Sequence, residues 1–341
     1  MDPEGRAEAL KEAKRRTLCF LWFIRNELGY HNLALADDEF PTADSLPLIP
    51  YHRESRRIHG KVRFSLNHIT EPFDQPDKLY RTSIAVGDYP VDHHHSAYEG
   101  PEALPDLSFY PVPSFGLPLG TLIPEDVEGL IVAEKSISVT NLVNGATRLQ
   151  PVVLQAGQAA GVLAALAVIK GVGIADVPVR DVQNVLLDAG GYLLPFLDVP
   201  RDHEWYKSLQ RIGSTGIMKG VGKNSGWSNQ TFFRAYEITQ ASDLEGLKDI
   251  YPLAEYDFSE TDLTVKQAVD LIRLVARQNS IEISESGLAE ALMMVFRGGV
   301  SEPDRPVLRG EMALLIDRAL DPFNNREVNL KGGFTGLPFP S

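Results

Sequence analysis

Residues 144–167 read Asn144-Gly-Ala-Thr-Arg148-Leu-Gln-Pro151-Val-Val-Leu-Gln155-Ala-Gly157-Gln158-Ala-Ala-Gly161-Val-Leu-Ala-Ala165-Leu-Ala167. This stretch predicts a polar turn that leads into a long apolar helix, with Pro151 in the first turn, where its missing N–H costs nothing. Gly157, Gly161 and Ala165 recur every four residues, so they form one smooth face that a backbone or a flat ligand can approach closely. The alternative that the residues leave open is an ordinary buried core helix.

The start of this predicted helix is the first candidate binding site. Arg148 precedes it, at a point where free backbone N–H groups and the positive end of the helix dipole favour an anion or a polarised carbonyl. We therefore expect the polar turn to face a ligand.

A wider block, residues 128–167, carries a family resemblance. It begins Glu128-Gly-Leu-Ile-Val-Ala-Glu-Lys135-Ser-Ile-Ser138 and resembles the C-terminal flavin-contacting segment of FAD-dependent oxidoreductases of the glutathione-reductase-like kind. The resemblance implies FAD as the cofactor and a helix whose first turn points at the pyrimidine end of the isoalloxazine ring, where it would stabilise the negative charge of the reduced ring. The cofactor-binding residues that the resemblance implies are Ser138, Asn144, Arg148, Leu149, Gln150 and Pro151.

The glycine-rich turn that normally opens such an enzyme is absent from the sequence. A strand, a Gly-x-Gly-x-x-Gly turn and a helix usually hold the pyrophosphate. The nearest match, Gly220-Val-Gly222-Lys-Asn-Ser-Gly226, has the wrong spacing and follows a helix-like segment. The resemblance thus covers the C-terminal half of a family member, and two explanations stay open: a truncation, or a separate chain that supplies the dinucleotide-binding half.

A cluster of arginines precedes this block. The segment 51–64, which contains Arg53-Glu-Ser-Arg-Arg57 and then Gly60, alternates like a strand and again resembles the FAD oxidoreductases. Forked hydrogen bonds from Arg53 could position an anionic substrate or a flavin group. The alternative is a structural ion-pair network with nearby acids.

A histidine run gives the candidates for proton transfer. It follows an apolar strand-like segment and reads Gly87-Asp-Tyr-Pro-Val-Asp92-His93-His94-His95. We expect His93 or His94 to act as a catalytic base, because histidine exchanges protons near neutral pH. A solvated loop is the alternative. A metal site is not expected, since no second cluster of ligands with metal-binding spacing accompanies the run.

The predicted fold class is α/β (α+β). It comprises a partial FAD-dependent oxidoreductase fold, with a substrate-domain sheet and the flavin-capping helix but without the N-terminal Rossmann unit, followed by a mainly helical domain. A buried parallel-type strand is expected at 130–133. The expected divisions are 1–175 for the oxidoreductase part, 176–202 for a helix and linker, 203–325 for the helical domain and 326–341 for a tail. Other expected helices cover 6–28, 177–189, 265–279, 286–296 and 309–320, with a surface loop over 32–50.

Composition excludes some classes of protein. Of the 341 residues, 43% are hydrophobic and the formal net charge is −13, which argues against a nucleic-acid partner. One cysteine permits no disulfide within the chain. Because Gln155 and Gln158 interrupt the apolar helix, we interpret it as buried in protein, and we expect no membrane span.

Two functions follow. The first is an FAD-dependent oxidoreductase, or the substrate and flavin-capping part of one, that transfers hydride between a small, carbohydrate-like substrate and flavin. The second is a non-catalytic scaffold whose helical domain binds glycans or protein partners, since residues 205–220 loosely resemble surface-layer-homology helices. Aromatic residues that could stack on sugars, or could instead be core residues, are Trp205, Tyr206, Trp227 and Phe232.

Overall fold

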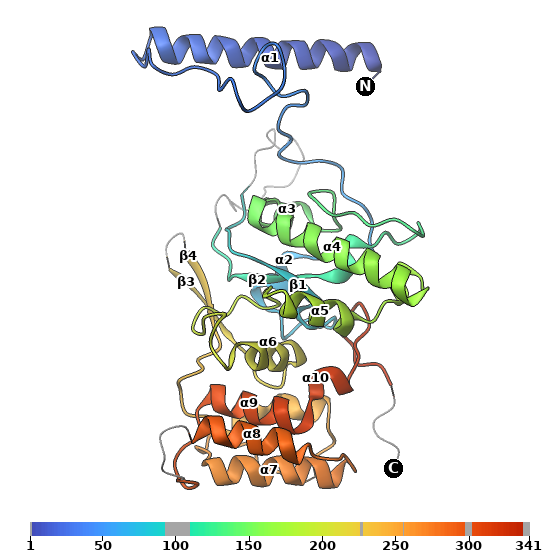
Figure 1. Ribbon diagram of the computed structural model, residues 1–341, viewed down its shortest axis with the longest axis vertical. Coiled ribbons are helices and arrows are strands. Elements are labelled where there is room, and N and C mark those ends of the chain that lie inside the picture. The colour runs from blue at the N-terminus through green and yellow to red at the C-terminus, as the bar shows by residue number, and fades with distance from the viewer. Residues whose placement is uncertain (1, 93–109, 226–227, 255, 297–301, 337–341) are drawn as a thin grey trace, which may run out of the picture. The chain divides into compact units, whose positions relative to one another are not determined.

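The computed structural model describes residues 2–92, 110–225, 228–254, 256–296 and 302–336 (Figure 1). By its contacts the chain divides into two compact units, Met1–Ser55 and Arg56–Ser341.

The first unit consists of one helix and an irregular segment. Helix α1 spans Pro3–Asn26 and begins at Asp2, whose carboxylate accepts a hydrogen bond from the Gly5 backbone N–H at 2.6 Å. Lys14 of α1 forms an ion pair with Asp44 at 2.5 Å, which attaches the irregular segment to the helix. The predicted helix over 6–28 and the loop over 32–50 are confirmed.

The second unit mixes helices with small sheets, as the predicted α/β class requires. Its first part contains α2 (Leu66–Thr70), η1 (Leu79–Thr82), β1 (Ser83–Gly87), β2 (Phe115–Pro118), η2 (Leu119–Leu122), α3 (Asn141–Thr147), α4 (Gln150–Lys170), η3 (Ile174–Asp176) and α5 (Val179–Asp188). The later part contains α6 (Tyr206–Thr215), β3 (Val221–Ser225), β4 (Ser228–Phe232), η4 (Ala241–Asp249), α7 (Val265–Gln278), α8 (Glu285–Val295), α9 (Arg309–Leu320) and α10 (Pro322–Asn325).

Both sheets have two antiparallel strands, β1 with β2 and β3 with β4. Two strand predictions are wrong. Segment 51–64 is irregular, with isolated bridges at Gly60 and Phe64 only. Segment 130–133 is irregular and at least partly exposed. It forms no strand because its backbone contacts the 3-10 turn η2: the Val132 N–H donates to the Leu122 carbonyl at 2.8 Å.

Helix α4 has one buried and one open face. It packs against β1 and α5 (Figure 1) through a buried face made of Val152, Ala156, Ala159, Ala160, Leu163 and Ala167. On the opposite face Leu154 is 72% exposed and Val168 81% exposed. Among the described residues of the second unit, a Cβ added at Gly157 or Gly161 would meet no atom within 4 Å, so nothing in this unit covers the small-residue face. The core-helix interpretation therefore holds for one face only.

By length and composition, α4 could cross a membrane. Core helices of soluble proteins pass the same test, and a third of the tested window is buried within this fold. The helix ends at Gly171, whose left-handed backbone (φ 64°) suits a residue without a Cβ.

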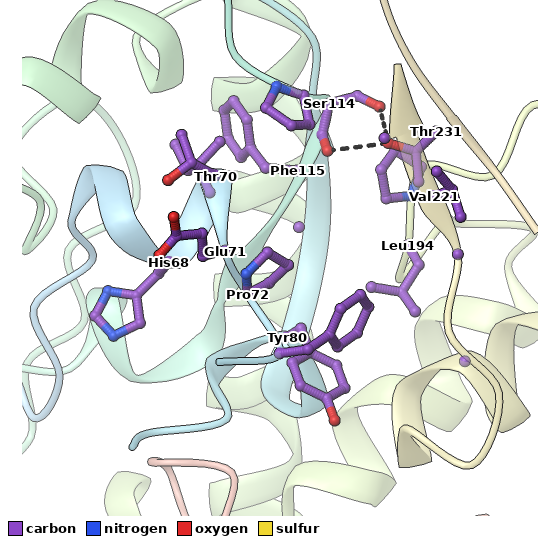
Figure 2. A pocket seen from close by; sticks show the side chains of 18 of the residues that line it. His68, Thr70, Glu71, Pro72, Tyr80, Ser114, Phe115, Leu194, Val221 and Thr231 are labelled. Carbon is purple, nitrogen blue, oxygen red and sulfur yellow. Dashed lines mark hydrogen bonds between the residues drawn. The ribbon is translucent and has the colours of Figure 1, made fainter. Parts of the chain in front are cut away.

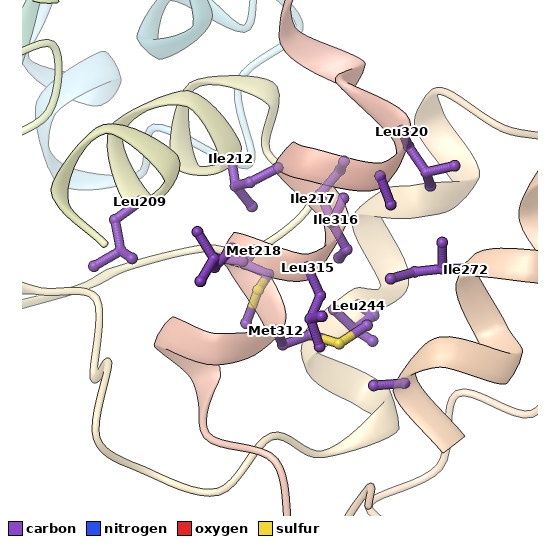
Figure 3. Packing of buried hydrophobic residues seen from close by; sticks show 14 of the residues in the cluster. Leu209, Ile212, Ile217, Met218, Leu244, Ile272, Met312, Leu315, Ile316 and Leu320 are labelled. Atoms are coloured by element: carbon purple, nitrogen blue, oxygen red, sulfur yellow. The ribbon is translucent and has the colours of Figure 1, made fainter. Parts of the chain in front are cut away.

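One hydrophobic core contains the buried residues of α4 and β1. A second hydrophobic core lies among the later helices (Figure 3). Helix α9 is at its centre, because 11 of its residues are buried. Met312 and Ile316 of α9 meet Ile212 from α6 and Ile272 from α7 in this cluster. The helices predicted over 177–189, 265–279, 286–296 and 309–320 are confirmed to within two residues at each end.

Two buried arginines join segments that are distant in sequence. Arg81 donates to the Thr215 carbonyl at 3.0 Å and the Gly332 carbonyl at 3.2 Å, and it pairs with Asp249 at 2.6 Å. Arg180 donates to the Arg81 carbonyl at 3.2 Å and stacks on Phe323, with the guanidinium carbon 4.2 Å from the ring centroid. These side chains satisfy backbone acceptors that would otherwise be buried without donors.

Substitution on the two faces of α4 should have unequal effects on stability. We expect Leu163→Ala to lower the free energy of unfolding by about 2–5 kcal/mol, because the side chain is fully buried and its loss leaves a cavity. Leu154→Ala, on the open face, should change it by less than about 0.5 kcal/mol. Urea denaturation of both variants checks this, and equal losses would mean that the open face is covered in solution.

Candidate functional site

A cavity of about 380 Å³ lies beside the first turn of α4. This volume is within the range of about 300–1,000 Å³ that is typical of small-molecule sites. Its walls come from the end of β1, the start of α4, a connecting segment and the β3–β4 hairpin. The lining residues are Val86, Gly87, Asp88, Ser114, Leu149, Pro151, Val152, Gln155, Tyr192, Pro195, Phe196, Leu197 and Asn229.

The first turn of α4 has no side-chain cap. Its N-cap residue is Leu149, which cannot accept a hydrogen bond, and Pro151 follows within the first turn. The positive end of the helix dipole is therefore not offset by a capping oxygen. An electron-rich or anionic edge of a ligand is favoured at this end of the cavity.

Gln155 fixes the end of β1 to α4. Its side-chain oxygen accepts from the Val86 N–H at 3.0 Å, and its Nε2 donates to the Val86 carbonyl at 3.1 Å. This residue was not predicted as part of a site. The signal in the sequence was a polar side chain within an apolar helix.

The hairpin contributes Asn229, which the sequence did not single out. The Asn229 backbone N–H donates to Asp88 Oδ1 at 3.2 Å, and the residue is 1% exposed. Its Nδ2 has no hydrogen-bond partner in the part of the chain that the structure describes. Nearby, Ser114 Oγ donates to Thr231 Oγ1 at 2.7 Å and so ties the hairpin to residue 114.

A second cavity, of about 300 Å³, shares Ser114 and Phe196 with the first. Figure 2 shows the Ser114–Thr231 hydrogen bond at one end of it and the Tyr80 ring at the other. Desolvation lowers the pKa of the half-buried His68 at its edge, and burial raises the pKa of Tyr80. Both shifts favour the neutral forms of these two side chains, and the carboxylates of Glu71 and Asp74 also line the cavity.

The structure brings part of the predicted cofactor set to the first cavity. Leu149 and Pro151 line it, and Gln150 lies exposed between them. Arg148 is not a lining residue. It ends α3, is 3% exposed, and donates from Nη2 to the carbonyl and the carboxylate of Asp92 at 3.1 and 3.3 Å. Its guanidinium therefore binds this chain's own anion.

Of the other predicted site residues, Asn144 and Ser138 do not line the first cavity. Asn144 is fully buried in α3, and neither polar atom of its side chain has a partner within the described residues. Ser138 is 2% exposed and packs beside Gly60. Arg53 is exposed and belongs to the first unit, whereas every lining residue belongs to the second. His93 and His94 fall outside the described residues.

No group of three or more potential metal ligands occurs among the residues that the structure describes.

Gln155 holds Val86 by two side-chain hydrogen bonds, and removing this clamp should destabilise the protein. Gln155→Leu leaves the Val86 N–H and carbonyl without their side-chain partner, and we expect a loss of about 1–3 kcal/mol in the free energy of unfolding. Gln158→Leu, an exposed position on the same helix, is the matched control and should be nearly neutral. Chemical denaturation measures both, and a neutral Gln155→Leu would show that the clamp is not formed in solution.

Comparison with known proteins gives one result. No curated protein and no solved structure matches the chain. A family model described as FAD dependent oxidoreductase matches residues 1–186 of the 341. Because the match spans more than half of the sequence, the chain belongs to the FAD-dependent oxidoreductase family.

Proposed function

We propose that this protein is the flavin-capping and substrate-side part of an FAD-dependent oxidoreductase, and that a dinucleotide-binding half outside residues 1–341 completes the FAD site. Family membership supports FAD binding and oxidoreductase activity. The observation that carries the finer proposal is the cavity at the uncapped start of α4. The glutathione-reductase-like subtype and a small, carbohydrate-like substrate belong to this proposal and rest on the resemblance alone.

The residues around the first cavity fit the ring end of FAD. Apolar side chains such as Leu149 and Phe196 suit the faces of a planar ring, and the positive end of α4 suits its electron-rich edge. When bound, flavin would supply hydride acceptance and donation. The task of the protein would be to hold the ring and to stabilise negative charge from the first turn of α4.

The described residues do not fit the pyrophosphate end in the same way. The closest glycine-rich stretch opens the β3–β4 hairpin, where a Cβ at Gly220 would meet Phe196 and one at Gly222 would meet Pro113. These glycines serve close packing of the hairpin and do not form the start of a helix. A dinucleotide-binding half outside residues 1–341 would resolve this mismatch.

The exposed apolar face of α4 also supports a dinucleotide-binding half that covers it. Exposed Leu154, Val168 and Ile169 flank the uncovered glycines on this helix. A contiguous exposed apolar face is typical of a surface that another protein covers.

The glycan-binding alternative finds less support. Trp205 is 8% exposed and Tyr206 is 3% exposed, and both belong to the second core. Phe232 is partly buried, and Trp227 falls outside the described residues. The rings of Trp205 and Tyr206 are thus committed to packing.

A comparison of two ligands tests the split arrangement. The chain alone should bind lumiflavin, which is the isoalloxazine ring without its ribityl phosphate chain, and should bind FAD no more than about tenfold more tightly. Isothermal titration with each ligand measures the two affinities. If FAD binds about a hundredfold more tightly than lumiflavin, the chain holds the pyrophosphate by itself and no further half is needed. If neither binds, the proposed function is wrong.

A charge placed at the start of α4 tests the electrostatic role. Leu149→Asp and Leu149→Asn should both stabilise the free protein, by about 0.5–1 kcal/mol, because each supplies the missing N-cap acceptor. Only the aspartate should also repel the negative charge of reduced lumiflavin. We expect wild type to bind reduced lumiflavin more tightly than the oxidised form, Leu149→Asn to keep part of that preference because it adds no charge, and Leu149→Asp to lose it. Anaerobic titration measures it, and identical behaviour of the two variants would contradict the role.

A further inference from the structure

We propose that Asn229, outside the segment that matches the family, recognises the polar edge of the ring in the cavity beside α4 and donates a hydrogen bond to it from Nδ2. The inference rests on the proposed function, because it takes an isoalloxazine ring as the occupant. It adds a binding residue from the β3–β4 hairpin to a site otherwise built by the family segment.

The first support is an unsatisfied donor. Asn229 lines the cavity, is 1% exposed, and its Nδ2 has no partner within the described part of the chain. A buried amide without a partner is costly, and such groups in native proteins usually have a ligand or a water to satisfy them. The carbonyl oxygens and ring nitrogens of an isoalloxazine are acceptors of the required kind.

The second support is the fixed position of the residue. The Asn229 backbone is held by Asp88 at 3.2 Å. Two residues along β4, Thr231 bonds to Ser114, and its carbonyl accepts from the Leu197 N–H at 3.0 Å. The hairpin is thus attached to the cavity wall on both sides of the strand, so the donor is held in place before a ligand arrives.

The third support is the agreement between two electropositive features. The uncapped start of α4 and the residue Asn229 border the same cavity and come from segments about 80 positions apart in the sequence. Asp88 also lines the cavity, where its carboxylate accepts from the Asn229 backbone N–H, and the rest of the wall is mostly apolar. A flat molecule with apolar faces and one acceptor-rich edge satisfies both features, whereas a purely apolar molecule would leave Nδ2 unpaired.

Titration of the full-length chain with lumiflavin tests the inference. We expect Asn229→Ala to weaken binding about three- to tenfold, which is the effect of one lost neutral hydrogen bond. Asn224→Ala is the matched control: Asn224 pairs with Asn229 across the hairpin and is exposed, so its variant should bind like wild type. If Asn229→Ala fails to fold, Asn229→Ser replaces it with the same expected direction.

The thermal melting of the ligand-free variants separates recognition from a structural role. Because Nδ2 is unpaired in the free protein, Asn229→Ala should melt at or above the wild-type temperature while it binds lumiflavin less well. A lower melting temperature with unchanged affinity would make the residue structural and overturn the inference. Unchanged affinity at unchanged stability would overturn it too, and the proposed function would stand. If wild type does not bind lumiflavin, both fail together.

Discussion

The contact between α4 and β1 is the constraint on which the candidate site depends. The buried face of α4 consists mostly of alanines, so the helix lies close to the sheet and its direction is fixed by packing. Gln155 then locks the register, because it binds both backbone groups of Val86. As a result, the uncapped first turn of α4 and the end of β1 form adjoining walls of one cavity.

The site combines residues from inside and outside the segment that matches the family. This segment ends at residue 186, yet the lining of the cavity continues with Tyr192, Pro195, Phe196, Leu197 and Asn229. The hydrogen bond between Ser114 and Thr231 joins the two regions, and Ser114 lines both cavities. A change in the hairpin can therefore alter what the cavity accepts without a change in α4.

Much of the helical framework could be predicted from the sequence, because its signals are local. Pro151 marks the start of α4 and Gly171 its end, and α7 begins at Thr264 with a capping box. The strands were less predictable, since a strand needs a partner that the local pattern does not reveal. Residues 130–133 are apolar enough for a buried strand, but no strand of the described chain pairs with them.

The site was predictable in the same partial way. The start of α4 carries Leu149 and Pro151 into the cavity wall, in keeping with the expectation of a ligand there. Asn229 and Gln155 owe their roles to partners 141 and 69 positions away, which no local pattern encodes. Arg148 illustrates the converse. Its position before a helix suggested an external anion, and the fold gives it the carboxylate of Asp92.

The buried guanidinium groups of Arg81 and Arg180 limit how the chain can be divided into fragments or recombined. Both lie within the family segment, but their acceptors include the carbonyls of Thr215, Gly332 and Arg326, far beyond it. A fragment that stopped at residue 186 would lose these acceptors and would expose to water the apolar side chains that pack beside the two cations. The helical region is thus an obligate half of one folding unit, and genetic exchange that replaced it would also have to replace the oxygen atoms that those cations require.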